Sequence, residues 1–176
     1  NEDIDVNGTE GGLPQLPAGF LVILNISDTD PTEWTLTTTD LTDLAGVLYA
    51  ADPEPEYVDI NQDNICVLTL QENNALVLID LATGNVTNSF TAGAVDLDQI
   101  DVTEEDLILA TGSQTQRLRE PDAVAWMGTE YFATANEGDL DGGSRSFSIF
   151  DTTGNVVYEA GNALDWITIR HGHYPE

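Results

Sequence analysis

The chain has 176 residues, long enough for one ordinary domain, and its 41% hydrophobic content favours a packed core over general disorder. It carries 32 acidic residues against four arginines and no lysine, so its formal net charge is −28. This balance disfavours nucleic acid and anionic membrane surfaces, because phosphate groups are bound by Lys and Arg. Membrane insertion is not expected, since no apolar run approaches the roughly 18 residues needed to cross a bilayer. The acids are scattered, and two interpretations stay open: solubility of a secreted protein at high ionic strength, or a surface that collects divalent cations.

The chain is predicted to be all-β, because its apolar runs are short, β-branched and closed by turn signals. Residues 1–18 are polar and rich in Gly and Pro, which predicts a flexible lead-in before a folded part over 19–176. The folded part begins with strands predicted at 20–26 and 34–37. A first group of four strands follows at 56–60, 65–70, 75–81 and 86–90. Two further strands are predicted at 99–102 and 107–111, and a second group of four at 123–127, 131–135, 146–150 and 156–159.

The two groups of strands repeat the same sequence features 66 residues apart, from Glu54 to Glu120. Glu54-Pro55-Glu56-Tyr57-Val58 is matched by Glu120-Pro121-Asp122-Ala123-Val124. The string Thr69-Leu70-Gln71-Glu72-Asn73-Asn74 is matched by Thr134-Ala135-Asn136-Glu137-Gly138-Asp139. Repeated four-stranded antiparallel units are typical of β-propeller blades. We therefore predict a partial β-propeller with blade-like repeats at about 54–90 and 120–160; a β-sandwich is the alternative.

The predicted ring is incomplete, since a closed propeller needs at least about four blades and this chain supplies about two. An open pair of blades would expose strand edges. We therefore expect the remaining blades to come from another chain or from identical chains, which would make this chain a fragment of a larger protein or assembly.

The repeat strings also resemble the choice-of-anchor I family of secreted or surface-anchored β-propeller proteins, some of which are alkaline-phosphatase-like. The resemblance covers about two thirds of the chain, from Glu54 to Glu176, whereas the segment 96–118 departs from it. The residues that carry it are Pro55-Glu56-Tyr57-Val58, Thr69 to Ala75, Pro121-Asp122-Ala123, Thr134 to Asp139 and Gly172-His173-Tyr174-Pro175-Glu176. The resemblance implies a propeller fold and an extracellular or cell-surface location rather than a particular reaction.

The second repeat contains a candidate calcium loop. Glu72 and Gly84 are 12 positions apart, whereas Glu137 and Gly154 are 17 apart, so the second copy has five extra residues. Four hard oxygen donors lie at this insertion: Asn136, Glu137, Asp139 and Asp141. Ca²⁺ binds about six to eight such oxygens. A solvated hairpin loop is the alternative interpretation, because Asp-Gly-Gly also forms turns. Segments 61–64 and 96–101 are weaker metal candidates of the same kind.

Other residues are candidates for ligand contacts. Arg117 and Arg119 can clamp a substrate anion or pair with neighbouring acids. His171 and His173 can share one face of a strand and hold a transition metal, or belong to a loop entering the next blade. Three sequons, at Asn7, Asn25 and Asn85, permit glycosylation in a eukaryotic secretory protein.

Two residue types are assigned structural roles. The single cysteine, Cys66, excludes an internal disulfide framework and lies in an apolar run that predicts a buried, inert thiol. The three tryptophans, Trp34, Trp126 and Trp166, lie in strand-like settings and are predicted to pack between blades. A carbohydrate-stacking role for any of them would need an exposed ring.

The sequence favours a secreted or cell-surface module for binding or assembly, and no catalytic residue is assigned. It has no Gly-x-Ser-x-Gly elbow, and a phosphate loop with its lysine is impossible without lysine. Two alternatives from other classes stay open. One is a calcium-dependent phosphoesterase-like enzyme completed by the missing blades, and the other is an acidic surface-coat or filament protein.

Overall fold

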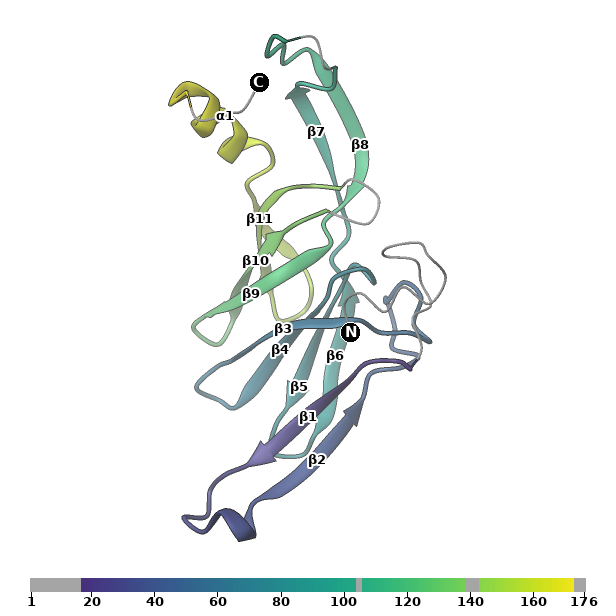
Figure 1. The fold of residues 1–176 in the computed structure, drawn as a ribbon, viewed down its shortest axis with the longest axis vertical. Coiled ribbons are helices and arrows are strands. Elements are labelled where there is room, and N and C mark those ends of the chain that lie inside the picture. Colours follow the sequence, from purple (N-terminus) through teal and green to yellow (C-terminus); the bar gives the residue numbers. More distant parts are fainter. Residues whose placement is uncertain (1–16, 104–105, 139–142, 173–176) are drawn as a thin grey trace.

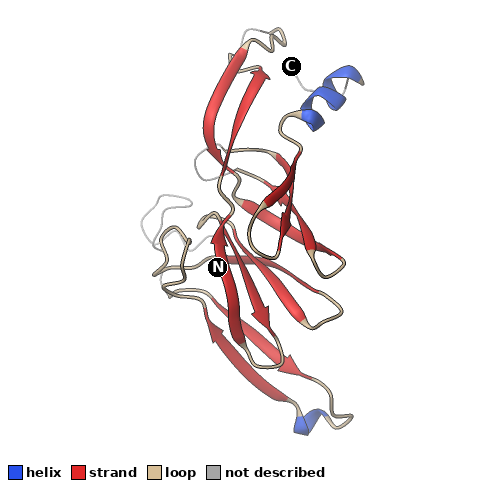
Figure 2. Cartoon of the chain, turned by 180° about the vertical axis from the view of Figure 1, so that it is seen from behind, coloured by secondary structure: helices blue, strands red, loops and turns tan. Residues whose placement is uncertain are grey.

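The computed structural model describes residues 17–103, 106–138 and 143–172, and these are all-β apart from two short helical segments. The strands form four antiparallel sheets, two with four strands and two with two strands. One two-stranded sheet and the two four-stranded sheets follow one another in a curved row, and the other two-stranded sheet extends beyond one end of it (Figure 1); Figure 2 shows the chain from behind with the strands in red. The described residues form no closed ring of sheets.

The order of the sheets follows the predicted repeats. A two-stranded sheet contains β1 (Phe20–Asn25) and β2 (Thr35–Asp40), with the 3-10 helix η1 (Pro31–Glu33) between them. The first repeat sheet contains β3 (Pro55–Ile60), β4 (Ile65–Leu70), β5 (Ala75–Asp80) and β6 (Asn85–Thr91). A hairpin of β7 (Ala94–Ile100) and β8 (Gly112–Leu118) precedes the second repeat sheet. That sheet contains β9 (Pro121–Met127), β10 (Tyr131–Asn136), β11 (Ser146–Asp151) and β12 (Val156–Glu159), and helix α1 (Ala163–Arg170) follows it.

The first repeat sheet is buried on both faces, which explains the continuous apolar runs of β4 and β5. Alternate residues of these strands, such as Leu68 and Val77, pack with Leu41 and with β1 on one side. The intervening residues, such as Val67 and Leu76, pack against the second repeat sheet on the other side. Each such fully buried aliphatic side chain contributes about 1.5–3 kcal/mol.

Cys66 lies on the first of these two faces and is buried, as the sequence predicts. Burial raises the pKa of its thiol to about 11, and the carboxylate of Asp59 adds to the effect. The thiolate is therefore disfavoured at neutral pH, and a buried neutral thiol is a poor nucleophile.

An aromatic cluster fills the contact between the two repeat sheets. The ring centroids of Phe132 and Phe150 lie 5.8 Å apart, and Trp126 meets Phe132 edge-on at 5.3 Å. Phe90 from the first sheet lies 6.4 Å from both phenylalanines. Aromatic pairs at these separations add about 0.5–1.5 kcal/mol to the burial of their surfaces. The backbone N–H of Trp126 also donates to a carboxylate oxygen of Asp59 (2.7 Å), which joins β9 to β3.

Two adjacent buried asparagines in the turn after β4 hold the segments that lead into the two repeats. The first, Asn73, accepts a hydrogen bond at Oδ1 from the backbone N–H of Glu54 (2.7 Å). Its Nδ2 donates to the carbonyl oxygens of Leu48 (2.8 Å) and Asp52 (3.0 Å). Asn73 therefore ties the incoming loop to its own sheet.

The second asparagine, Asn74, ties the next repeat to this sheet. Its Oδ1 accepts a hydrogen bond from the backbone N–H of Glu120 (2.9 Å), and its Nδ2 donates to the carbonyl oxygen of Gly93 (3.0 Å). The Asn74 backbone has a φ of 47°, in the left-handed region that Asn adopts more readily than most residues. Both ends of the β7–β8 hairpin are thereby fixed to one side chain.

The strand register corrects the alignment of the repeats by one residue. Pro55 pairs with Leu70 in the first repeat sheet, and Pro121 pairs with Asn136 in the second. Leu70 is therefore the structural equivalent of Asn136, whereas the sequence strings align Thr69 with Thr134. Successive side chains of a strand face opposite sides, so this shift exchanges the faces. In the corrected register Cys66 corresponds to Phe132, and each faces the preceding sheet. The repeats are stacked head to tail.

Two predicted elements differ from the structure. The strands expected at 99–102 and 107–111 are displaced. The first strand of the hairpin, β7, begins and ends earlier than predicted, and the second, β8, begins and ends later. The alternating Ala94 to Ile100 segment and the polar Gly112 to Leu118 segment pair with each other without a buried core, so no apolar run marks them. Helix α1 was not expected, since its eight residues are too few for a helical period to be recognised.

We predict that Asn74→Ala lowers the free energy of unfolding by about 2–4 kcal/mol. The substitution removes the buried partners of the Glu120 N–H and the Gly93 carbonyl, and unsatisfied buried polar groups are costly. Urea unfolding measures the change. Asn85→Ala is the matched control, because Asn85 is exposed at the start of β6, and it should change stability by less than about 0.5 kcal/mol. Equal effects of the two substitutions would contradict the assigned role of Asn74.

Candidate functional site

A cavity of about 200 Å³ lies between the β7–β8 hairpin, helix α1 and the residues just before β11. The hairpin and the helix both extend beyond the second repeat sheet and approach each other at one end of the molecule (Figure 1). We call this space the hairpin–helix cavity. Its walls come from segments far apart in the sequence.

The walls of the hairpin–helix cavity combine apolar and polar side chains. Trp166 and Ile169 line it from helix α1, opposite Leu97 and Ile100 of the hairpin. The polar lining residues come from all three segments: Gln99, Asp101, Gln114, Arg145, Asn162 and Asp165. A small apolar space with a few polar groups is the common form of a ligand site.

Hydrogen bonds fix two of the polar groups in place. The Nδ2 atom of Asn162, the residue before α1, donates to the carbonyl oxygens of Asp98 (2.7 Å) and Gln99 (3.3 Å). The carboxylate of Asp101 accepts hydrogen bonds from the backbone N–H groups of Thr103 (3.4 Å) and Leu109 (3.1 Å). The start of the helix is thus hydrogen-bonded directly to the hairpin. The side-chain oxygens of Asn162 and Asp101 are held in fixed positions as acceptors at the cavity.

The charges in the cavity are nearly balanced. Partial burial raises the pKa of Asp165, while the positive charge of Arg145 acts in the opposite direction. Asp101 provides a second carboxylate at the wall. Gln99 has a φ of 56°, so one wall residue is held in the left-handed region that costs energy for most side chains.

The four predicted calcium ligands are only partly described. Asp139 and Asp141 lie outside the described residues. Asn136 is buried, where its Nδ2 donates to the Ser148 hydroxyl (2.8 Å) and its Oδ1 accepts from the Thr134 hydroxyl (2.9 Å). Glu137 is exposed and accepts a hydrogen bond from Gln71 Nε2 (2.7 Å). Asn136 and Glu137 nevertheless line one open pocket together with Asp122 and Arg145, and the calcium loop stays a prediction.

Of the two weaker metal candidates, 61–64 forms a local turn and 96–101 lies mostly on β7. The Oδ1 atom of Asn61 accepts from the backbone N–H groups of Asp63 (3.0 Å) and Ile65 (3.1 Å), closing the turn between β3 and β4. Asp96 accepts from the backbone N–H of Gln116 (2.8 Å) across the hairpin. Within the described ranges, no group of three His, Cys, Asp or Glu side chains is arranged to hold a metal ion.

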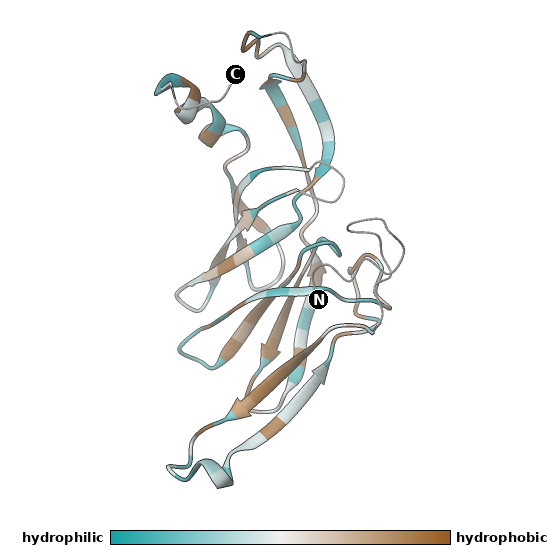
Figure 3. Cartoon of the chain, viewed as in Figure 1, coloured by the Kyte–Doolittle hydropathy of each residue, from teal (hydrophilic) through white to brown (hydrophobic). Residues whose placement is uncertain are grey.

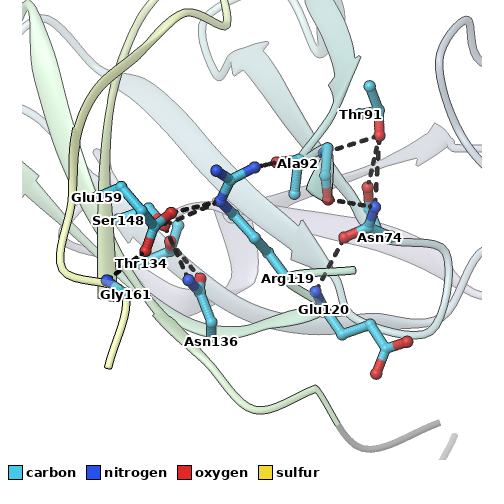
Figure 4. A network of polar contacts seen from close by, with 11 residues as sticks. Asn74, Thr91, Ala92, Arg119, Glu120, Thr134, Asn136, Ser148, Glu159 and Gly161 are labelled. Carbon is cyan, nitrogen blue, oxygen red and sulfur yellow. Dashed lines mark hydrogen bonds and ion pairs between the residues drawn. The ribbon is translucent and has the colours of Figure 1, made fainter. Parts of the chain in front are cut away.

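Arg119 is buried in a polar network between the two repeat sheets (Figure 4). Its Nε forms an ion pair with Glu159 (2.7 Å) and a hydrogen bond with Ser148 (3.2 Å), and its Nη1 donates to the Ala92 carbonyl (2.6 Å). Pairing with an acid was one of its two predicted roles. Arg117 lies half-buried on β8.

The remaining candidates are placed as follows. His171 is exposed directly after α1, whereas His173 lies outside the described residues. Among the sequons, Asn25 and Asn85 are exposed at the end of β1 and the start of β6, and Asn7 lies outside the described residues.

The tryptophans differ from one another in their environments. Trp126 packs between the repeat sheets as predicted. Trp34 is 40% exposed beside η1, and its Nε1 donates to the Asp28 carbonyl (2.9 Å), so the prediction of inter-sheet packing is wrong for it. Trp166 lies on helix α1 at the hairpin–helix cavity, so the strand-like setting predicted for it is also wrong. Sequence reasoning missed this cavity, because its polar residues belong to no motif.

A second chemical feature lies where the first strands of the repeats begin. Glu54 and Glu120 occupy equivalent positions before Pro55 and Pro121, and their exposed fractions are 3% and 0%. Burial raises the pKa of Glu54 to about 7, with further contributions from the nearby carboxylates of Asp52 and Glu72. The Oε1 atom of Glu54 is buried and has no hydrogen-bond partner among the described residues. This carboxyl group is therefore protonated up to near-neutral pH.

Comparison with known protein families identifies the chain. The model of the choice-of-anchor I domain matches residues 33–142, which is more than half of the sequence. The chain belongs to the choice-of-anchor I family. The matched part includes the first repeat sheet, the hairpin and all of β9 and β10, whereas β11, β12 and α1 lie beyond it. No curated protein and no solved structure matches the chain.

Choice-of-anchor domains are characteristic of surface-anchored and secreted proteins, which agrees with the family resemblance seen in the repeat strings. The described part of this choice-of-anchor I domain contains no helix that is both long and apolar enough to span a bilayer. The match identifies the family and the general class of protein, and it assigns no reaction or ligand.

We predict that Glu54→Gln makes stability less dependent on pH. The Glu54 carboxyl keeps its proton to about pH 7 in the folded domain but loses it near the ordinary value of 4.5 when unfolded. The folded state therefore binds more protons between these values, and wild-type stability falls as the pH rises from about 4.5 to 7. Above pH 7 the neutral Gln variant should be more stable than the wild type by on the order of 2 kcal/mol.

Urea unfolding between pH 4 and pH 8 measures this effect, and the two proteins should converge near pH 4. Glu130→Gln serves as the control, because Glu130 is exposed in the turn between β9 and β10. A Glu54→Gln variant that loses stability with rising pH as steeply as the wild type would contradict the assignment.

Proposed function

We propose that this choice-of-anchor I domain is a propeller-type module of a secreted or cell-surface protein, used for binding and assembly. In this proposal its sheets are blades, and the head-to-tail row continues beyond both ends through further blades. The proposal rests on one observation: the faces at the two ends of the row are apolar and exposed among the described residues.

The first end is the outer face of the β1–β2 sheet. Phe20, Val22, Leu24 and Leu36 share this face and are 46–64% exposed. The other face of β1 carries Leu21 and Ile23, which pack on the first repeat sheet. Figure 3 shows that β1 is hydrophobic along its length. A strand with apolar residues on both faces is typical of a sheet that is covered on both sides.

The second end is the far face of the second repeat sheet. Met127, Tyr131 and Tyr158 are 42–52% exposed there, and the rings of Phe147 and Tyr158 stack at 5.5 Å. This face is structurally equivalent to the face of the first repeat sheet that packs on β9 and β10. Removing such apolar surface from water is worth about 25 cal/mol per Å².

The occupant that best matches either end is another sheet of the same kind. In each contact between successive sheets of the row, the face of one sheet that points toward the C-terminal end of the row packs on the face of the next sheet that points toward the N-terminal end. A second copy of this chain can repeat that contact by placing its β1–β2 face on the second repeat sheet of the first copy. Head-to-tail contacts of this type close into rings or extend into filaments.

We predict that the isolated chain self-associates at high salt. The net charge of −28 makes copies repel each other at low ionic strength, whereas at 1 M salt charges are screened beyond about 3 Å. Light scattering after size-exclusion chromatography at 0.05 M and 1 M NaCl should show an increase from the 19.0 kDa monomer to larger species. A monomer at both concentrations would contradict assembly from identical chains.

A double substitution tests which surface is used. Val22→Thr with Leu24→Thr places β-branched residues that suit a strand on β1 but makes its exposed face polar, and it should abolish the association at 1 M NaCl. Val102→Thr is the matched control, because Val102 is exposed beyond β7 and lies on neither end face. Association that survives the double substitution would exclude the β1–β2 face as the contact.

A further inference from the structure

We infer that the hairpin–helix cavity binds a neutral saccharide. A sugar ring has an apolar face of C–H groups and an edge of hydroxyl groups that both donate and accept hydrogen bonds. Its site therefore needs a flat apolar wall, fixed polar groups around it and little net charge. The hairpin–helix cavity has all three properties, and none of them follows from the family match.

The apolar wall is provided by helix α1. Trp166 and Ile169 are three positions apart, so they lie on one face of the helix, and both line the cavity. An indole ring offers a large, rigid, flat surface together with one polar N–H group. Trp166 is half-buried, and so one part of its surface remains accessible from the cavity.

The polar groups come from side chains of different segments that converge on the same space. The two hydrogen bonds from Asn162 Nδ2 to the hairpin leave its amide oxygen as an acceptor of fixed orientation. Gln114 contributes from β8 an amide that can both donate and accept, and Arg145 contributes donors only. Vicinal hydroxyl groups suit this mixture of donors and acceptors.

The charges favour a neutral ligand over an anionic one. The cavity holds one guanidinium, that of Arg145, against the carboxylates of Asp101 and Asp165. Anionic sugars would be repelled by the net charge of −28 and by both carboxylates. Uncharged hydroxyl groups avoid this repulsion.

This inference rests on the proposed function in one respect: it assumes that the chain is part of a secreted or cell-surface protein, which is exposed to saccharides. Its experiment does not depend on assembly, because binding is measured at 0.05 M NaCl, where the chain is expected to be monomeric. Loss of saccharide binding with retained self-association, or the reverse, would therefore separate the two proposals.

The test uses the full chain, fluorescently labelled, on an array of immobilised neutral and anionic oligosaccharides. The neutral oligosaccharide with the strongest signal is then titrated in solution by isothermal calorimetry. We expect binding to one or more neutral oligosaccharides and none to uronic-acid or sulfated ones. Absence of binding to every neutral oligosaccharide, or a preference for anionic ones, would overturn the proposal.

Substitutions place the binding in the cavity. Trp166→Ala should weaken the affinity for the selected oligosaccharide by at least about tenfold, which corresponds to 1.4 kcal/mol. Trp34→Ala is the matched control, since Trp34 is exposed near η1 and away from the cavity, and it should leave the affinity unchanged. Equal affinities of Trp166→Ala and the wild type would overturn the proposal.

A second variant guards against a change in folding. Gln114→Ala alters a polar lining residue on β8 and leaves α1 intact, and we expect it to weaken the affinity several-fold with unchanged circular dichroism and thermal midpoint. Should Trp166→Ala unfold helix α1, the Gln114→Ala result decides the question. Full affinity in Gln114→Ala together with lost structure in Trp166→Ala would count against direct contact with the saccharide.

Discussion

The arrangement of the two repeats depends on the hydrogen bonds of one turn, the one that contains Asn73 and Asn74. Backbone groups that enter a sheet from a loop have no partner in the sheet, and burial makes an unpaired group costly. Asn73 supplies such partners to the loop before β3, and Asn74 supplies them to both ends of the β7–β8 hairpin. The apolar faces determine that the sheets stack, and these two amides determine where each following segment starts.

The buried Arg119 also fixes the position of the outer strand of the second repeat sheet. Its contacts with Ala92, Ser148 and Glu159 join the end of the first repeat to β11 and β12. A buried ion pair contributes little net stability, because desolvation offsets the attraction between the charges. It does restrict geometry, since a displaced sheet would leave a buried charge without a partner. Together with Asn74, Arg119 therefore fixes the base of the hairpin while its outer part remains available to form the hairpin–helix cavity.

The sequence predicted the repeat sheets well because their strands have apolar residues on one or both faces. The bounds of β4 and β12 match the prediction, and the other repeat strands differ by one or two residues. The hairpin could not be located, because Gly112 to Leu118 is polar and pairs outside any core. The repeat alignment was one residue out, because Glu72 and Glu137 look alike although Gln71 is the structural equivalent of Glu137. The Gln71–Glu137 hydrogen bond between neighbouring sheets marks that equivalence.

The candidate site was missed for a related reason, which also explains what kind of site it is. Gln114 lies on the hairpin that joins the two repeat sheets, and Asn162 and Trp166 follow the second one; no periodic pattern signals a role there, and only the folded chain brings these residues together. Because the facing sides of the repeat sheets are covered by each other, the side chains on them serve packing and have little surface left for a ligand. Connections are not under that constraint. In a row of stacked sheets, a ligand site is therefore expected between successive connections, and the pair that extends furthest from the row, β7–β8 and α1, encloses such a space.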